Sequence, residues 1–128
     1  MIKLIKNKDQ AHEITNDKNV TSIGAAQDSA TEGYSPIDYI TSSVAMCMAL
    51  TLDAVLDRGD IEVDSYEIKT SAVKANTSPS RLEKIDVEIE FKGNVDDATK
   101  EKLVLIAKRG CTIGNTIEHG APVNVSSN

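Results

Sequence analysis

Two cysteines are the residues of this chain best suited to chemistry. Cys47 lies within an apolar stretch, and Cys111 follows two cations, Lys108 and Arg109, 64 positions further along. A thiolate can attack the O–O bond of a peroxide and become a sulfenic acid, which a second thiol converts into a disulfide. An external thiol then resets the pair. The chemistry requires the two Cα atoms to come within about 7 Å, which sequence spacing alone does not show.

Each cysteine also has a simpler interpretation. Free cysteine is among the most frequently buried residues, so Cys47 could be a small apolar side chain of the core. Cys111 could be a capping or packing residue, although neighbouring cations and a helix beginning there would both favour its thiolate. The residue types leave both interpretations open.

Other polar residues offer weaker candidates for a site. His12 and His119 could join the two cysteines in a zinc site, but no pair of them has the close spacing typical of zinc ligands. No motif marks the orienting partner or oxyanion site that a Cys–His hydrolase needs. Asp38 is most simply a helix-capping acid. We therefore do not expect a metal site.

Composition restricts the partners and the compartment. The 128 residues are suited to one domain. Their 14 Lys+Arg against 20 Asp+Glu give a net charge of −6, and such a surface repels nucleic acid and anionic lipid. The amino terminus does not resemble a signal peptide. The most apolar run, residues 44–50, is far shorter than the roughly 20 residues of a membrane span. We expect a cytoplasmic protein with reduced thiols.

The strongest predicted element is a long helix. Its opening signals are a capping serine, a proline in the first turn and an acid three residues after the cap: Ser35, Pro36 and Asp38. The helix should run to Asp57 or Arg58 and stop at Gly59. Residues 44–50 are apolar on all faces, which predicts a central helix wrapped by a sheet or by a partner subunit.

Strands and shorter helices fill the rest of the chain. Residues 1–26 hold two or three short strands. The alternation at Ile85, Val87, Ile89 and Phe91, after a weaker alternation over residues 61–75, predicts an antiparallel hairpin. A second helix begins at residues 94–97 and ends at Gly110. A short helix over residues 111–118 and a last strand over 121–125 follow. This order favours an α+β fold.

The segments around the two cysteines resemble those of one family. The helix start at residues 35–36 with residues 45–51 resembles the central helix of the OsmC/Ohr family, and residues 107–113 resemble its second cysteine segment. The resemblance covers roughly residues 20–126. It implies a single OsmC-like domain over residues 1–128, with an antiparallel sheet, a long buried central helix and a second helix. It also implies an intertwined homodimer.

The resemblance further implies a chemistry. Active members of the family reduce organic hydroperoxides in oxidative-stress defence, which makes Cys47 the peroxidatic and Cys111 the resolving thiol. A dithiol donor such as a lipoyl-type group would be the reductant, without metal, flavin or haem.

The chain also departs from the best-studied peroxidases. Those carry a glutamate directly after the helix-opening proline, where this chain has Ile37. They also carry an arginine in the N-terminal strand region, whereas the first arginine here is Arg58. Arg58, Arg81, Arg109 or a partner-chain lysine are the candidates to replace it. The alternative function is a non-catalytic OsmC-like stress protein that binds a small apolar or electrophilic ligand at the dimer interface.

Overall fold

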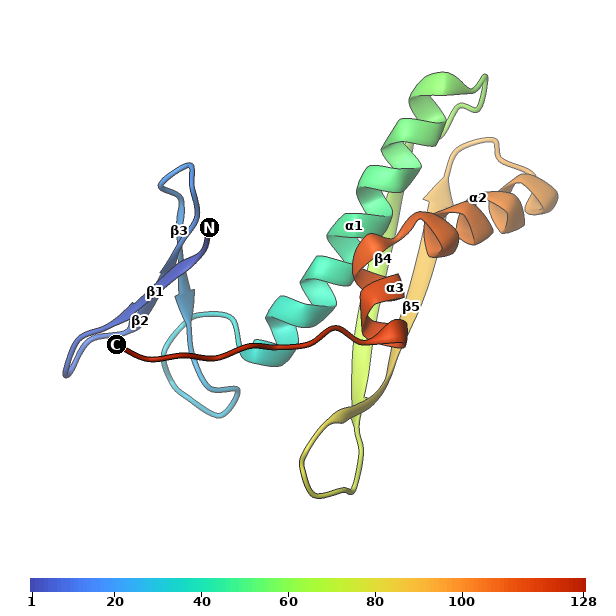
Figure 1. Ribbon diagram of the computed structural model, residues 1–128. Coiled ribbons are helices and arrows are strands. Elements are labelled where there is room, and N and C mark those ends of the chain that lie inside the picture. The colour runs from blue at the N-terminus through green and yellow to red at the C-terminus, as the bar shows by residue number, and fades with distance from the viewer. The chain divides into compact units, whose positions relative to one another are not determined.

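The computed structural model describes residues 1–128 and divides them into two compact units, Met1–Thr41 and Ser42–Asn128. The boundary falls inside the long helix. The elements are, in chain order, β1 (Lys3–Lys6), β2 (His12–Thr15), β3 (Thr21–Gly24), α1 (Pro36–Arg58), β4 (Ser65–Lys74), β5 (Leu82–Lys92), α2 (Asp97–Gly110) and α3 (Thr112–His119) (Figure 1). Helices and antiparallel sheets in this arrangement confirm the predicted α+β class.

The first unit contains a three-stranded antiparallel meander in the order β1-β2-β3. Lys3 pairs with Thr15, and His12 pairs with Gly24. These strands lie where short strands were predicted. Every residue of β1 is exposed, and both cysteines belong to the second unit.

The start of α1 follows the predicted capping pattern. The Ser35 N–H donates to Asp38 Oδ2 at 2.8 Å, and the Asp38 N–H donates to Ser35 Oγ at 3.2 Å. This reciprocal pair satisfies two of the donors that a helix N-terminus leaves unpaired. The capping role predicted for Asp38 is therefore confirmed. The other end is also as predicted, because α1 stops at Arg58, before Gly59.

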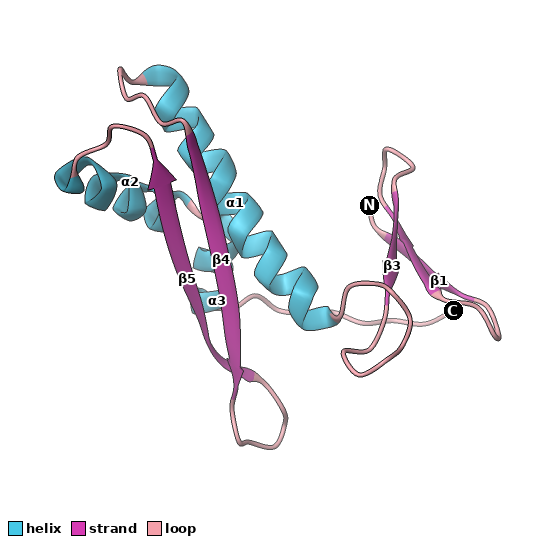
Figure 2. Ribbon diagram, turned by 180° about the vertical axis from the view of Figure 1, so that it is seen from behind, coloured by secondary structure: helices cyan, strands magenta, loops and turns pink.

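In the second unit, the helices cover one face of the β4–β5 hairpin (Figures 1 and 2). Tyr66 pairs with Phe91 and Ile68 with Ile89, so apolar side chains from both strands share one face. The alternate residues of β5 are charged and exposed, as the strict alternation predicted. The hairpin therefore supplies a one-sided platform for α1.

The buried core joins this platform to all three helices. It consists of Val44, Met48, Leu52, Phe91, Leu103, Ala107 and Cys111. On α1 the buried positions recur every four residues, whereas Met46 and Leu50 on its other side are 57% and 56% exposed. A single chain thus buries only one side of a helix that is apolar all round.

By length and composition alone, α1 could cross a membrane, since an 18-residue window has a mean hydropathy of 1.6. The prediction from the sequence considered only the short run of residues 44–50. It therefore did not predict that an 18-residue window of the helix has this high mean hydropathy.

The C-terminal part of the chain agrees with prediction except at its end. The Asp96 carboxylate caps α2 by accepting the Thr99 N–H at 2.7 Å. Hydrogen bonding from the Thr99 side chain and from its backbone N–H lowers the pKa of Asp96. The strand predicted over residues 121–125 is wrong, because the segment is exposed and has no regular structure. The segment pairs with neither of the two sheets, and Pro122 has no N–H to donate.

A tyrosine links β4 to α1. The Tyr66 hydroxyl lies 2.6 Å from Asp53 Oδ1 and 3.3 Å from the Ala49 carbonyl oxygen. Burial, together with the hydrogen bond to Asp53 and its charge, raises the pKa of Tyr66 to about 12. The protonated phenol is therefore the form that the fold stabilises.

Tyr66→Phe should lower the free energy of unfolding by about 1 kcal/mol at neutral pH, because one hydrogen bond is lost. The raised pKa means that this contribution is complete below the ordinary tyrosine pKa of about 10 and disappears as the pH rises toward 12. Urea unfolding of both proteins at pH 8, 10 and 11.5 measures the difference. A difference that stays constant or widens with pH would contradict this role for Tyr66.

Candidate functional site

Cys47 lies in the middle of α1 and is half-buried. It lines an open groove of about 660 Å³, together with Leu50 and Thr51 of α1 and Ile106 of α2. Arg58 lines the same groove. The first thiol therefore faces a largely apolar surface hollow that a small molecule could enter.

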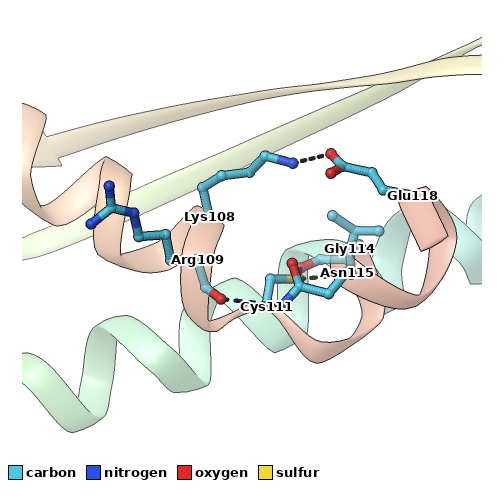
Figure 3. A network of polar contacts seen from close by, with 7 residues as sticks. Lys108, Arg109, Cys111, Gly114, Asn115 and Glu118 are labelled. Carbon is cyan, nitrogen blue, oxygen red and sulfur yellow. Dashed lines mark hydrogen bonds and ion pairs between the residues drawn. The ribbon is translucent and has the colours of Figure 1, made fainter.

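Cys111 is fully buried between α2 and α3, where it caps the N-terminus of α3. Its sulfur accepts the Gly114 N–H at 3.1 Å (Figure 3). Its thiol donates weakly to the Val44 carbonyl oxygen on α1, 3.9 Å away. A side chain at Gly114 would place a Cβ only 3.2 Å from this sulfur. The short helix predicted from residue 111 is confirmed, with the cysteine as its cap.

The electrostatics of Cys111 oppose ionisation. Burial raises the pKa of its thiol, because desolvation disfavours the thiolate. The Gly114 N–H acts in the opposite direction, while hydrogen bonding to Cys47 and charge repulsion from it raise the pKa further. The structure thus brings together two thiols that lie 64 positions apart in sequence.

The expectation that nearby cations favour a Cys111 thiolate is not met. Lys108 forms an ion pair with Glu118, and the Arg109 side chain points away from the sulfur (Figure 3). The Arg109 carbonyl oxygen instead accepts a bond from the Asn115 side chain at 3.1 Å. Desolvation therefore exceeds the effects of charge and helix terminus that the sequence suggested.

The proposed substitutes for the family arginine fall into two places. Arg58 and Arg109 line the groove that Cys47 faces, although Arg58 Nε donates to the Ala54 carbonyl oxygen at 3.1 Å. Arg81 lines a different hollow, beside Val44. Neither sulfur has an arginine or lysine among its hydrogen-bond partners.

The two histidines, which were weaker candidates for a metal site, lie in different elements. His12 lies in β2 and His119 in the last turn of α3. No group of three or more His, Cys, Asp or Glu side chains is arranged to hold a metal ion. The groove beside Cys47 was missed by the sequence analysis, since its walls come from separate helices and no single motif spans them.

Comparison with known proteins identifies the family. A family model described as OsmC-like protein matches residues 27–126. No functionally curated protein matches the chain significantly. The chain belongs to the OsmC-like protein family.

Solved structures show the same fold at low sequence identity. An OsmC-like protein from Mycoplasma pneumoniae aligns with a TM-score of 0.81 and 15% identity, covering 92% of this chain and 86% of that one. An organic hydroperoxide resistance protein OsmC from Legionella pneumophila gives 0.72 and 13%, covering 91% and 88%. An organic hydroperoxide resistance protein from Elizabethkingia anophelis gives 0.72 and 12%, covering 91% and 86%. Within this fold, α1 is the core helix.

The unequal exposure of the two thiols predicts unequal alkylation. At pH 8, iodoacetamide should modify Cys47 on the order of ten times faster than Cys111, which is buried and has a raised pKa. Mass spectrometry of peptides from the native protein measures both rates. Unfolding in guanidinium should make the two rates similar, and equal rates in the native protein would contradict the burial of Cys111.

Proposed function

We propose that the protein is a thiol-dependent organic hydroperoxide reductase of oxidative-stress defence, with Cys47 as the peroxidatic and Cys111 as the resolving cysteine. The observation that carries the proposal is the pairing of one accessible thiol with one buried thiol that interacts with it.

The two steps balance with an organic hydroperoxide and a dithiol. The Cys47 thiolate attacks the O–O bond, takes the terminal oxygen as sulfenic acid and releases the alcohol. The Cys111 thiol then attacks the Cys47 sulfur, a disulfide forms and water leaves. A dithiol donor, such as a lipoyl-type group, returns two electrons and two protons and is itself oxidised to a disulfide.

The different environments of the thiols suit these roles. Cys47 lines the groove, so a hydroperoxide can reach its sulfur while apolar groups such as Leu50 and Ile106 contact the organic part. Cys111 has a raised pKa and no exposed surface, which protects it from direct attack by peroxide. It would react only with the sulfenic acid formed beside it.

The named relatives support the same chemistry. Two proteins that share the fold are described as organic hydroperoxide resistance proteins. At identities of 13% and 12%, these relatives support only the class of chemistry. The roles proposed for Cys47 and Cys111 depend on the geometry described above.

Residues 1–128 would form one domain of an intertwined homodimer in the cytoplasm. The exposed apolar side of α1, at Met46 and Leu50, supports a subunit partner, because water contact with large apolar side chains is unfavourable. The acidic net charge of −6 supports the absence of a nucleic-acid or membrane partner.

One observation favours the alternative function. Neither thiol has a cationic hydrogen-bond partner, and a cation is the usual means of stabilising a reactive thiolate. As a non-catalytic OsmC-like stress protein, it would hold a small apolar or electrophilic ligand at the dimer interface without turnover.

Consumption of cumene hydroperoxide in the presence of dihydrolipoamide tests the proposed function. The wild-type protein should turn over repeatedly, and Cys47→Ser should reduce the rate to the uncatalysed background, because the attacking sulfur is absent. Cys111→Ser should reduce about one equivalent of hydroperoxide per chain and then retain a sulfenic acid that dimedone traps.

The two cysteine variants serve as matched controls for each other. Undiminished turnover in Cys47→Ser would refute the proposal. Absence of both turnover and a single-equivalent reaction in the wild type would favour the ligand-binding alternative.

A further inference from the structure

Thr51 contacts the backbone at both cysteine segments. Its hydroxyl oxygen lies 3.1 Å from the carbonyl oxygen of Cys47, one helical turn earlier, and 3.3 Å from the carbonyl oxygen of Gly110. Gly110 directly precedes Cys111 and ends α2. One hydroxyl therefore lies between the residue that carries the first thiol and the residue that precedes the second.

The two contacts differ in what they explain. A threonine hydroxyl that bonds the carbonyl four residues earlier is common in helices, and this accounts for the contact with Cys47. The contact with Gly110 has no such local cause, because 59 positions separate the two residues. It satisfies one of the carbonyl groups that the end of α2 leaves without an intrahelical partner.

Gly110 permits this approach. A Cβ at position 110 would lie 2.6 Å from Thr51 Cγ2 and 3.2 Å from Thr51 Oγ1, distances at which the Thr51 side chain or the end of α2 must move. The glycine therefore lets the end of α2 lie directly on α1, and the Thr51 hydroxyl holds it there by a hydrogen bond to the Gly110 carbonyl oxygen.

We propose that Thr51 is a positioning residue for the thiol pair, which holds the Gly110–Cys111 segment against α1 so that the Cys111 sulfur meets that of Cys47. This deepens the proposed function by naming the residue that sets the efficiency of disulfide formation. The effect of Thr51 on catalysis rests on the proposed function, whereas its effect on the placement of the two thiols does not.

Equilibration with glutathione tests this role without any hydroperoxide. The reduced protein and glutathione disulfide exchange to give the Cys47–Cys111 disulfide and two molecules of glutathione, so the equilibrium constant reports how well the thiols are placed. Thr51→Val keeps the shape of the side chain but removes the hydroxyl. It should lower this constant roughly three- to tenfold, the value of one neutral hydrogen bond.

Two further variants separate positioning from general stability. Thr51→Ser keeps the hydroxyl and should retain most of the wild-type constant. Thr41→Val removes a comparable hydroxyl of α1, whose oxygen lies 2.8 Å from the Ile37 carbonyl oxygen, and should leave the constant unchanged. If Thr51→Val does not fold, Gly110→Ala provides the test, because displacement of the same segment should lower the constant in the same direction.

The outcomes distinguish this proposal from the proposed function. Equal constants for wild type and Thr51→Val would overturn the positioning role. A loss in Thr51→Ser or in Thr41→Val as large as the loss in Thr51→Val would also overturn it. A wild-type protein that fails to reduce hydroperoxide but shows the predicted loss in Thr51→Val would retain the positioning role and refute the peroxidase. In an active enzyme, Thr51→Val should slow formation of the Cys47–Cys111 disulfide three- to tenfold.

Discussion

The packing of α2 against α1 fixes the position of the second thiol. Leu103, Ala107 and Cys111 follow one another at intervals of four residues, and each is at most 1% exposed. The buried residues of α1, Val44, Met48 and Leu52, have the same spacing. Side chains at this spacing form a ridge along one side of a helix, and two such ridges can interlock. Cys111 ends one ridge, so its sulfur is placed by the fit of the core and not by a flexible loop. Adding or removing even one methylene group in this core would change the position of the Cys111 sulfur.

This placement has a chemical consequence. The same burial that fixes Cys111 also raises the pKa of its thiol, so a thiol positioned in this way is a poor free nucleophile. In the proposed reaction, a sulfenic acid at Cys47 would remove this disadvantage, because the attack by Cys111 would be intramolecular. The accessible Cys47 thiol would react with the hydroperoxide first, and the buried Cys111 thiol would react only afterwards. Unequal exposure would thus set the order of the two proposed steps.

Much of the fold could be predicted because its signals are local. The capping pair of Ser35 and Asp38 and the alternation in β5 each lie within a few residues. The prediction over residues 121–125 failed because a strand needs a neighbour, which a local pattern cannot supply. At the site, residue types and family resemblance identified both cysteines. The raised pKa of Cys111 and the contact of Thr51 with Gly110 depend on tertiary packing, so no spacing in the sequence reveals them.

The departures from the best-studied peroxidases acquire a physical meaning in this structure. Asp38 follows the position where those enzymes carry a glutamate, but its carboxylate accepts the Ser35 N–H and is committed to the helix cap. Lys108 is committed to Glu118, and Arg58 Nε to the end of its own helix. Of the groove's two arginines, Arg109 is therefore the one whose guanidinium makes no such contact. The proposed function needs a group that stabilises a Cys47 thiolate, and the candidates are Arg109, a rearranged Arg58 or a residue of a second subunit. The proposed reactivity of Cys47 would thus depend on groups that lie outside α1 or at its far end.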